Sequence, residues 1–136
     1  MNDVFELDPR LARDCETISE FQLCLVLLMK DSNYPWFILV PKVFNAVEIV
    51  ELTGNQQQQL LTESNIVSRF ILDYFKAEKL NVAALGNVVK QLHIHHLGRF
   101  ESDAAWPNPV WNACAAKPYP AEQISDIRRA FEHYID

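Results

Sequence analysis

The sequence predicts an α+β protein built on an antiparallel sheet. Short apolar runs bounded by turn residues are typical of strands. Two other segments carry apolar residues at intervals of three, four and seven, which is the spacing of helices. The order along the chain is strands, one long helix, more strands and a terminal helix, and this order favours an antiparallel sheet. The length of 136 residues predicts a single domain, residues 1–136.

The first part of the chain contains a predicted hairpin. Residues 7–16 have a proline near their start and predict a short helix. The apolar runs at 21–29 and 34–40 predict two strands, and the Asp-Ser-Asn sequence at 31–33 supplies the turn between them. Both runs are apolar on parts of both faces, so we expect a helix to cover one side of the sheet.

Two helices are predicted from apolar spacing. The longer one covers residues 55–77, with apolar positions spaced by seven, four and four at Leu60, Val67, Ile71 and Phe75. A final helix begins at Pro120, because proline suits the first helical turn. Its apolar stripe has spacings of three, four and four at Ile124, Ile127, Phe131 and Ile135.

Two further strands are predicted between these helices, at residues 79–85 and 91–100. Gly86 and Asn87 lie between the two runs and supply a turn. The segment that follows, residues 104–111, contains too much proline for a regular element.

The composition excludes several classes of partner. Lys and Arg number 12 and Asp and Glu number 18, which gives a formal net charge of −6. A phosphate backbone requires a basic face, so we expect no binding of nucleic acid or of an anionic membrane. The longest apolar run, residues 23–29, is too short to cross a bilayer.

The cysteines and the N-terminal residues predict a cytoplasmic protein. Cys15, Cys24 and Cys114 are few, odd in number and without a CxxC spacing, which predicts reduced thiols packed as small apolar groups. Charges occur throughout residues 1–15, so we expect no signal peptide.

Three of the four histidines occupy one stretch of four residues, 93–96, in the last predicted strand. Alternation along a strand places Gln91, His93 and His95 on one face and His96 on the other. Polar groups on an otherwise apolar strand are costly unless they have partners or a function. We therefore interpret Gln91, His93 and His95 as a candidate site and His96 as structural.

Two chemistries suit this pair of imidazoles. They can converge on one atom as metal ligands, or one of them can attack an electrophile. No acidic or thiolate third ligand stands at metal spacing beside His93 and His95, so the sequence predicts no metal site.

The segment GNVVKQLHIHHLGR resembles the motif of the histidine triad (HIT) superfamily of nucleotidyl hydrolases and transferases. The family motif is His-φ-His-φ-His-φ-φ, where φ is apolar, after a Gly-Gln-Ser/Thr-Val turn. Gln91 replaces the first histidine, His93 stands at the nucleophile position and His95 is the last histidine. The resemblance is to a small bacterial subgroup whose motif reads Gln-x-His-x-His.

The resemblance extends over about residues 21–100. The run WFILVPK at 36–42, preceded by Asp31, is similar to the family's second strand and the acidic residue before it. Asn81 is similar to an Asn that precedes the motif turn. The resemblance implies a HIT-like antiparallel sheet of about five strands with one long helix and a C-terminal helix.

The resemblance also implies an activity without a cofactor. His93 would attack the α-phosphorus of a purine nucleotide or nucleotide conjugate and form a nucleotidyl-histidine intermediate. His95 would donate to a phosphoryl oxygen or the leaving group, and Gln91 would supply an amide donor. Phosphoramidates and dinucleoside polyphosphates are the expected substrate types.

Further residues are expected to bind the nucleotide. Asp31 would accept from the ribose hydroxyls, Asn81 and Asn87 would donate to phosphate, and Arg99 would contact phosphate or pair with an acidic side chain at the surface. Turn stabilisation remains the alternative for Asp31 and Asn87. HIT hydrolases of this type are homodimers, so we expect a homodimer.

Two other functions remain open. The change of the first motif histidine to Gln91 would suit a catalytically weak nucleotide-binding module, because an amide cannot shuttle protons. A protein that ligates metal through His93 and His95 is the third hypothesis.

Overall fold

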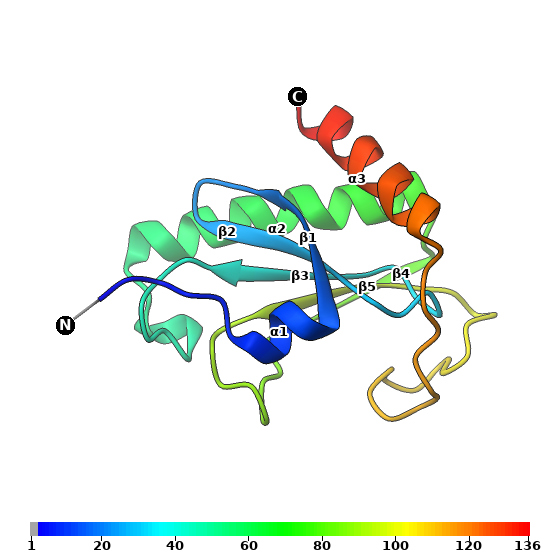
Figure 1. Cartoon of the computed structure of the whole chain (residues 1–136), viewed down its shortest axis with the longest axis horizontal. Coiled ribbons are helices and arrows are strands. Elements are labelled where there is room, and N and C mark those ends of the chain that lie inside the picture. Colours follow the sequence, from blue (N-terminus) through cyan, green and yellow to red (C-terminus); the bar gives the residue numbers. More distant parts are fainter. Residues whose placement is uncertain (1–2) are drawn as a thin grey trace.

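The protein folds around one five-stranded antiparallel sheet, as the sequence predicts (Figure 1). The structure is a computed structural model and describes residues 3–136. The strand order is β1-β2-β3-β5-β4. In chain order the elements are α1 (Pro9–Asp14), β1 (Cys15–Glu20), β2 (Cys24–Met29), β3 (Trp36–Pro41), the 3-10 turn η1 (Ile49–Glu51), α2 (Gly54–Phe75), β4 (Lys79–Ala83), β5 (Ile94–Arg99) and α3 (Ala121–Ile135).

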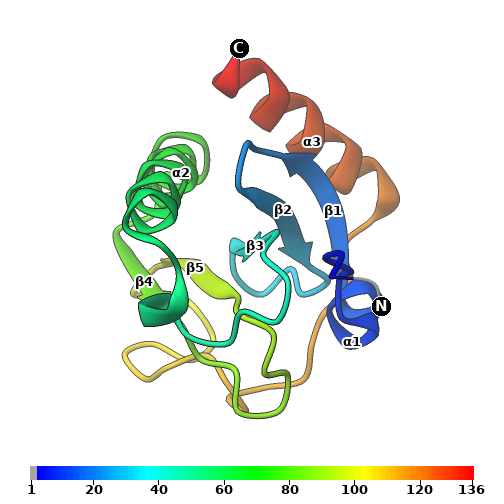
Figure 2. The same cartoon turned by 90° about the vertical axis from the view of Figure 1, so that its left-hand side faces the viewer.

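The two faces of the sheet are covered differently. Figure 2 shows α2 and α3 on one side, and α1 with the loops that flank β5 on the other. On the helical side, Phe37 of β3 packs with Phe70 of α2 and Phe131 of α3, with ring centroids 5.0 to 6.4 Å apart. This side forms the larger apolar core, since the side chains of both helices meet the sheet there.

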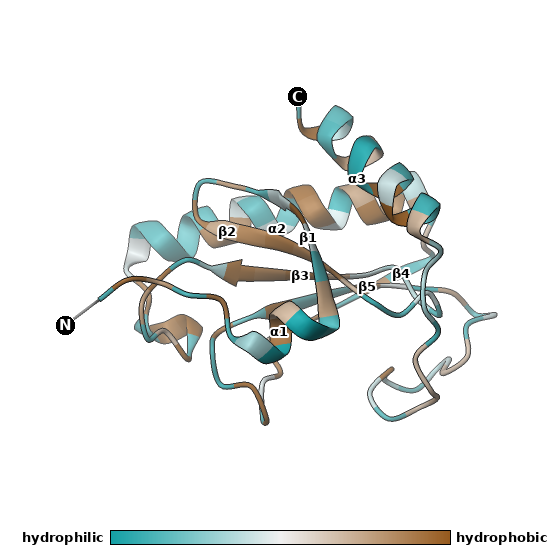
Figure 3. Cartoon of the chain, in the orientation of Figure 1, coloured by the Kyte–Doolittle hydropathy of each residue, from teal (hydrophilic) through white to brown (hydrophobic). Residues whose placement is uncertain are grey.

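The central strands are the most apolar part of the molecule, as Figure 3 shows for β2 and β3. Every residue of β3 and β5 is buried, whereas the edge strand β4 is partly exposed. A strand covered on both faces needs apolar residues on both, and this explains why residues 34–40 lack alternation.

Helix α2 begins directly after its capping residue, Thr53. The Thr53 hydroxyl accepts from the Gln56 N–H at 3.1 Å, and the Gln56 side chain accepts from the Thr53 N–H at 2.9 Å. This reciprocal pair satisfies two N–H groups that a helix start leaves unbonded. The helix ends at Phe75 before Lys76, which adopts a left-handed conformation with φ 59°.

Every predicted element is present, but several predicted boundaries were wrong, and β2 and β3 begin at Cys24 and Trp36 instead of at residues 21 and 34. The helix predicted at 7–16 is shorter, and a strand not predicted from the sequence, β1, begins at Cys15. The strand predicted at 79–85 ends at Ala83. The strand predicted at 91–100 begins at Ile94, because the Leu92 N–H bonds to the Ala46 carbonyl of a loop, 2.9 Å away, instead of to the sheet.

None of the helices within residues 3–136 combines the length and the apolar character needed to cross a membrane.

Candidate active site

His93 and His95 lie together beside a hollow on the face of the sheet that α2 does not cover. Their ring centroids are 4.9 Å apart and their planes meet at 67°. The hollow has a volume of about 490 Å³. Its walls come from α1, the ends of β2 and β3, the loop before β5 and the loop after it: Leu11, Asp14, Met29, Trp36, Ile38, residues 85–89, Trp111 and Asn112.

The proton of His93 is fixed by the backbone. Its Nδ1 lies 2.7 Å from the Gln91 carbonyl oxygen. A carbonyl only accepts, so Nδ1 carries a proton, and in the neutral ring the lone pair is on Nε2. No described residue bonds to Nε2. His93 is 6% exposed and lines the hollow, so Nε2 is the ring nitrogen left without a protein partner beside it.

Gly86 allows the loop to approach the His93 ring. A Cβ at this position would stand 2.9 Å from the His93 Cε1 and 2.5 Å from the Val89 carbonyl oxygen. Both distances are too short for real contacts. The turn predicted at Gly86 and Asn87 therefore forms one wall of the site, and only glycine fits there.

Both nitrogens of His95 are engaged in hydrogen bonds. The Trp36 indole N–H donates to Nδ1 at 3.0 Å, and Nε2 lies 2.9 Å from the Leu85 carbonyl oxygen. His95 is therefore neutral with its proton on Nε2. Burial lowers the pKa of His95 to about 4, although the bond to the Leu85 carbonyl opposes this shift.

Aromatic rings enclose His95. Trp111 meets it edge-on with centroids 5.1 Å apart, and Trp111 also meets Trp36 at 5.9 Å. Trp106, which the sequence groups with Trp111, instead lies over the Arg99 guanidinium at 5.7 Å. Only one of the two tryptophans after β5 thus belongs to the hollow.

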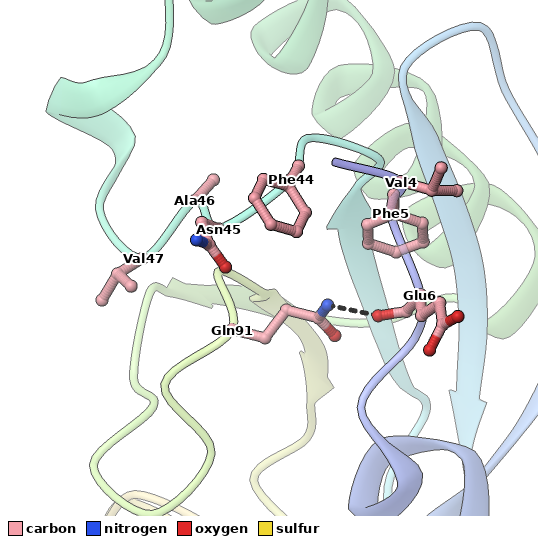
Figure 4. Close-up of a pocket in the computed structure, with 8 residues that line it drawn as sticks. All are labelled: Val4, Phe5, Glu6, Phe44, Asn45, Ala46, Val47 and Gln91. Atoms are coloured by element: carbon pink, nitrogen blue, oxygen red, sulfur yellow. Dashed lines mark hydrogen bonds between the residues drawn. The ribbon is translucent and has the colours of Figure 1, made fainter. Parts of the chain in front are cut away.

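The Gln91 side chain binds the N-terminal segment and is not among the residues that line the histidine hollow. Its amide donates to the Glu6 carbonyl at 2.8 Å (Figure 4) and its oxygen accepts from the Asp8 N–H at 2.8 Å. It lines a separate hollow of about 730 Å³, and Figure 4 shows it below the side chains of Phe5 and Phe44. Gln91 contacts the His93 ring through its backbone carbonyl and not through its side chain.

Asn87 and Lys90 lie beside His93. Both line a small cavity of about 80 Å³ that borders the His93 ring, together with Gly86 and Gln91. Asn87 was expected at the site from the sequence, whereas Lys90 was not. Lys90 is the only cationic residue between β4 and the histidines, and that position was a signal available in the sequence.

Asp31 lies in an adjoining hollow of about 400 Å³, which shares Met29, Trp36 and Trp111 with the histidine hollow. One of its oxygens, Oδ1, accepts from the Asn33 N–H, the Asn33 amide and the Lys117 N–H, at 2.8 to 3.2 Å. Asp31 thus stabilises the turn between β2 and β3, and its second oxygen has no partner among the described residues.

Arg99 and Asn81 bind each other away from the histidines. The Arg99 guanidinium, 2% exposed, donates to the Asn81 side-chain oxygen at 2.7 Å and to both oxygens of Asp103 at 2.8 and 3.0 Å. A further bond reaches the Asn108 carbonyl at 2.8 Å. These contacts tie the loop after β5 to the sheet, and neither residue lines the histidine hollow.

Within residues 3–136, no group of three or more His, Cys, Asp or Glu side chains is placed to hold a metal ion.

Comparison with known proteins identifies the family. Residues 10–102 match the HIT domain, so the chain belongs to the HIT family, whose members are generally nucleotide-binding hydrolases and transferases. No curated protein gives a significant match.

Three solved structures are similar over nearly the whole chain. A histidine triad protein from Marinobacter aquaeolei is 46% identical, with 96% of each chain covered and a TM-score of 0.93. One from Bradyrhizobium japonicum is 43% identical, with 98% of this chain and 99% of that one covered and a TM-score of 0.95. One from Sinorhizobium meliloti is 41% identical, with 96% of each covered and a TM-score of 0.93. The predicted family and fold are confirmed.

Proposed function

We propose that the protein is a nucleotidyl hydrolase or transferase that attacks the α-phosphate of a nucleotide conjugate with His93. The observation that carries this proposal is the 2.7 Å contact between the His93 Nδ1 and the Gln91 carbonyl. It fixes the proton on one nitrogen and leaves the other as a nucleophile at the wall of a hollow.

The reaction takes two displacements. His93 Nε2 forms a bond to the α-phosphorus as the bond to the leaving group breaks, and the bonding electrons depart with that group. The Gln91 carbonyl stabilises the positive charge that develops on the ring. Water or another acceptor then attacks the phosphorus and loses a proton to the solvent, the P–N bond breaks, and its electrons return to Nε2.

The loop before β5 supplies donors for the phosphoryl oxygens. Among the described residues, no acceptor bonds to the backbone N–H groups of residues 86–90 or to the Asn87 amide. Lys90 adds a positive charge beside His93. Unbonded N–H groups and a cation are the groups that stabilise charge on a phosphoryl oxygen.

The nucleoside fits the adjoining hollow. Trp36 and Trp111 line both hollows and offer faces for a purine base. The second oxygen of Asp31 is available for a ribose hydroxyl. We leave Asn81 and Arg99 out of substrate binding, because their polar groups are used in the buried cluster with Asp103.

The homodimer would form through the edge strand β4. Its backbone has one free side in the sheet order, and Val82 on it is 51% exposed. An exposed edge strand with an apolar side chain favours pairing with a second copy. Size-exclusion chromatography with light scattering tests this expectation.

The proposed activity is tested with a panel of adenosine and guanosine conjugates that carry amine, sulfate or phosphate leaving groups. Alkaline quenching followed by mass spectrometry should detect a nucleotide on His93, because the P–N bond is stable in base. Nucleotide binding without turnover of any substrate would favour the weak binding module. Loss of the rate with chelator and its return with one metal would favour the metal protein.

A further inference from the structure

One of the two hydrogen-bond partners of His95, the Trp36 indole, is a group that can only donate. An indole N–H has no acceptor capacity, so its 3.0 Å bond to His95 Nδ1 requires that this nitrogen carry no proton. The Leu85 carbonyl, which only accepts, requires a proton on Nε2. His95 cannot become an imidazolium without losing the bond from Trp36.

The charged and titratable groups around His95 give it no additional proton. His93 donates from Nδ1 to the Gln91 carbonyl, and His96 lies on the opposite face of the strand. Asp14, the acidic residue of the hollow, pairs with Arg13 at 2.8 Å, and this bond lowers the pKa of its carboxyl. Lys90 lines the small cavity and is not among the residues of the hollow that holds His95.

We propose that Trp36 is a positioning residue that keeps His95 neutral, so that His95 gives no proton to the leaving group and the enzyme prefers conjugates whose α-phosphate bears an oxygen leaving group stable as an anion. Phosphate, sulfate and carboxylate belong to this class. This inference rests on the proposed function and narrows its substrates.

The bond changes explain the preference. When His93 Nε2 bonds to the α-phosphorus, the P–O bond to a sulfate or phosphate breaks and the oxygen keeps the electron pair as a stable anion. Breaking a P–N bond to an alkylamine requires a proton on the departing nitrogen, and His95 held by Trp36 cannot supply it. A positioned general acid contributes about 10² to 10⁴-fold in rate.

The test compares two substrates that share adenosine monophosphate, namely adenylyl sulfate and the N-butyl phosphoramidate. For the wild-type protein we expect kcat/KM on the sulfate to exceed that on the amidate by about 100-fold or more. Trp36→Phe removes the indole N–H, and the smaller ring also lets water reach His95 Nδ1, which relieves the burial that disfavours a charged imidazole. Nδ1 can then take a proton, so the ratio should fall by about 10-fold. Trp111→Phe is the control, because Trp111 contacts His95 without a hydrogen bond to it. Loss of its contact with the shared base should lower kcat/KM on both substrates alike, and the ratio should stay near the wild-type value.

The outcomes separate this inference from the proposed function. Equal rates of the wild-type protein on both substrates overturn the inference and leave the function standing. An unchanged ratio in folded Trp36→Phe does the same. If no conjugate is turned over by His93, the proposed function fails and the substrate preference fails with it.

A second measurement needs no variant of Trp36. ¹⁵N NMR of histidine-labelled protein, with His95 assigned through His95→Gln, should show Nδ1 unprotonated and Nε2 protonated at every pH from about 5 to 8, because a bond from a pure donor fixes that tautomer. A protonated Nδ1 in this range overturns the inference.

Discussion

His93 and His96 lie three residues apart in the sequence, and one of the two ring nitrogens is bonded in the same way in both. Each donates from Nδ1 to the carbonyl two residues before it, at 2.7 Å to Gln91 and 3.0 Å to Ile94. They differ at Nε2. In His96 this nitrogen accepts from the Ser64 hydroxyl of α2 at 2.7 Å, whereas in His93 it has no partner among the described residues. A fixed tautomer is thus a local backbone effect, and an unused nitrogen beside a hollow distinguishes the candidate nucleophile.

Burial and a shifted pKa do not make this distinction. Burial lowers the pKa of both His95 and His96 to about 4, yet one lines the hollow and the other lies within the core beneath α2. The face of the sheet on which a side chain lies decides its role. Helix α2 covers one face with apolar side chains, while loops and tryptophans leave space on the other.

The largest expected effect comes from His93→Ala. Removal of the nucleophile should lower kcat/KM by at least about 1,000-fold, because the two-step route is lost. The midpoint of thermal unfolding should change little, since the ring borders a hollow. Steady-state kinetics and a thermal scan measure both quantities. A variant that keeps more than a few per cent of the rate would contradict covalent catalysis by His93.

The different positions of His93 and His96 were predictable from the sequence in outline. Alternation along residues 91–97 separated His93 and His95 from His96 although the strand begins only at Ile94. The motif could not show that the side chain of Gln91 binds backbone groups of the N-terminal segment, because those partners are 83 and 85 residues away in the sequence. Long-range contacts of this kind depend on how loops close, and no local pattern encodes them.

The strand β1 was missed for a related reason. Its sequence CETISE is polar at four of six positions, and only Cys15 and Ile18 are buried. Pairing with the apolar β2 creates this strand, and intrinsic strand preference contributes little. The role of Trp36 was likewise hidden, since an aromatic residue in an apolar run predicts core packing, and its hydrogen bond to His95 depends on the register of β3 against β5.

His96→Ala should reverse the pattern expected for His93→Ala. Deleting this buried ring leaves a cavity and an unpaired Ser64 hydroxyl, so the free energy of unfolding should fall by about 2 to 4 kcal/mol. Activity should fall far less than in His93→Ala when measured below the unfolding temperature. Urea unfolding measures the loss, and Ser64→Ala, which removes only the hydroxyl, should cost about 1 to 2 kcal/mol. A stable but inactive His96→Ala protein would place His96 in the chemistry.

Acid should destabilise the fold through both buried histidines. The folded-state pKa of His95 and of His96, about 4, lies below the ordinary value of 6.5. The unfolded chain therefore binds protons first as the pH falls, and stability is lost between about pH 6.5 and 4. Linkage gives a loss of about 2 kcal/mol per histidine between pH 7 and 5. Urea unfolding at the two pH values measures it, and His96→Gln should remove about half of the difference. If His96→Gln loses as much free energy of unfolding between pH 7 and 5 as the wild-type protein does, His96 does not contribute to the acid effect.

The smallest expected effect comes from Gln91→His, which restores a histidine to the first motif position. The amide donor and acceptor of Gln91 sit on one carbon and match the Glu6 carbonyl and the Asp8 N–H, each 2.8 Å away. The two nitrogens of an imidazole diverge and can keep only one of these bonds, so the free energy of unfolding should fall by about 1 kcal/mol. We expect kcat to fall only a few-fold, because the backbone carbonyl that holds His93 remains. Urea unfolding and steady-state kinetics test this, with Gln91→Glu as the matched variant that keeps the acceptor for Asp8 and loses the donor to Glu6. A rise in kcat in Gln91→His, with unchanged stability, would mean that the side chain at position 91 reaches the substrate and takes part in the chemistry.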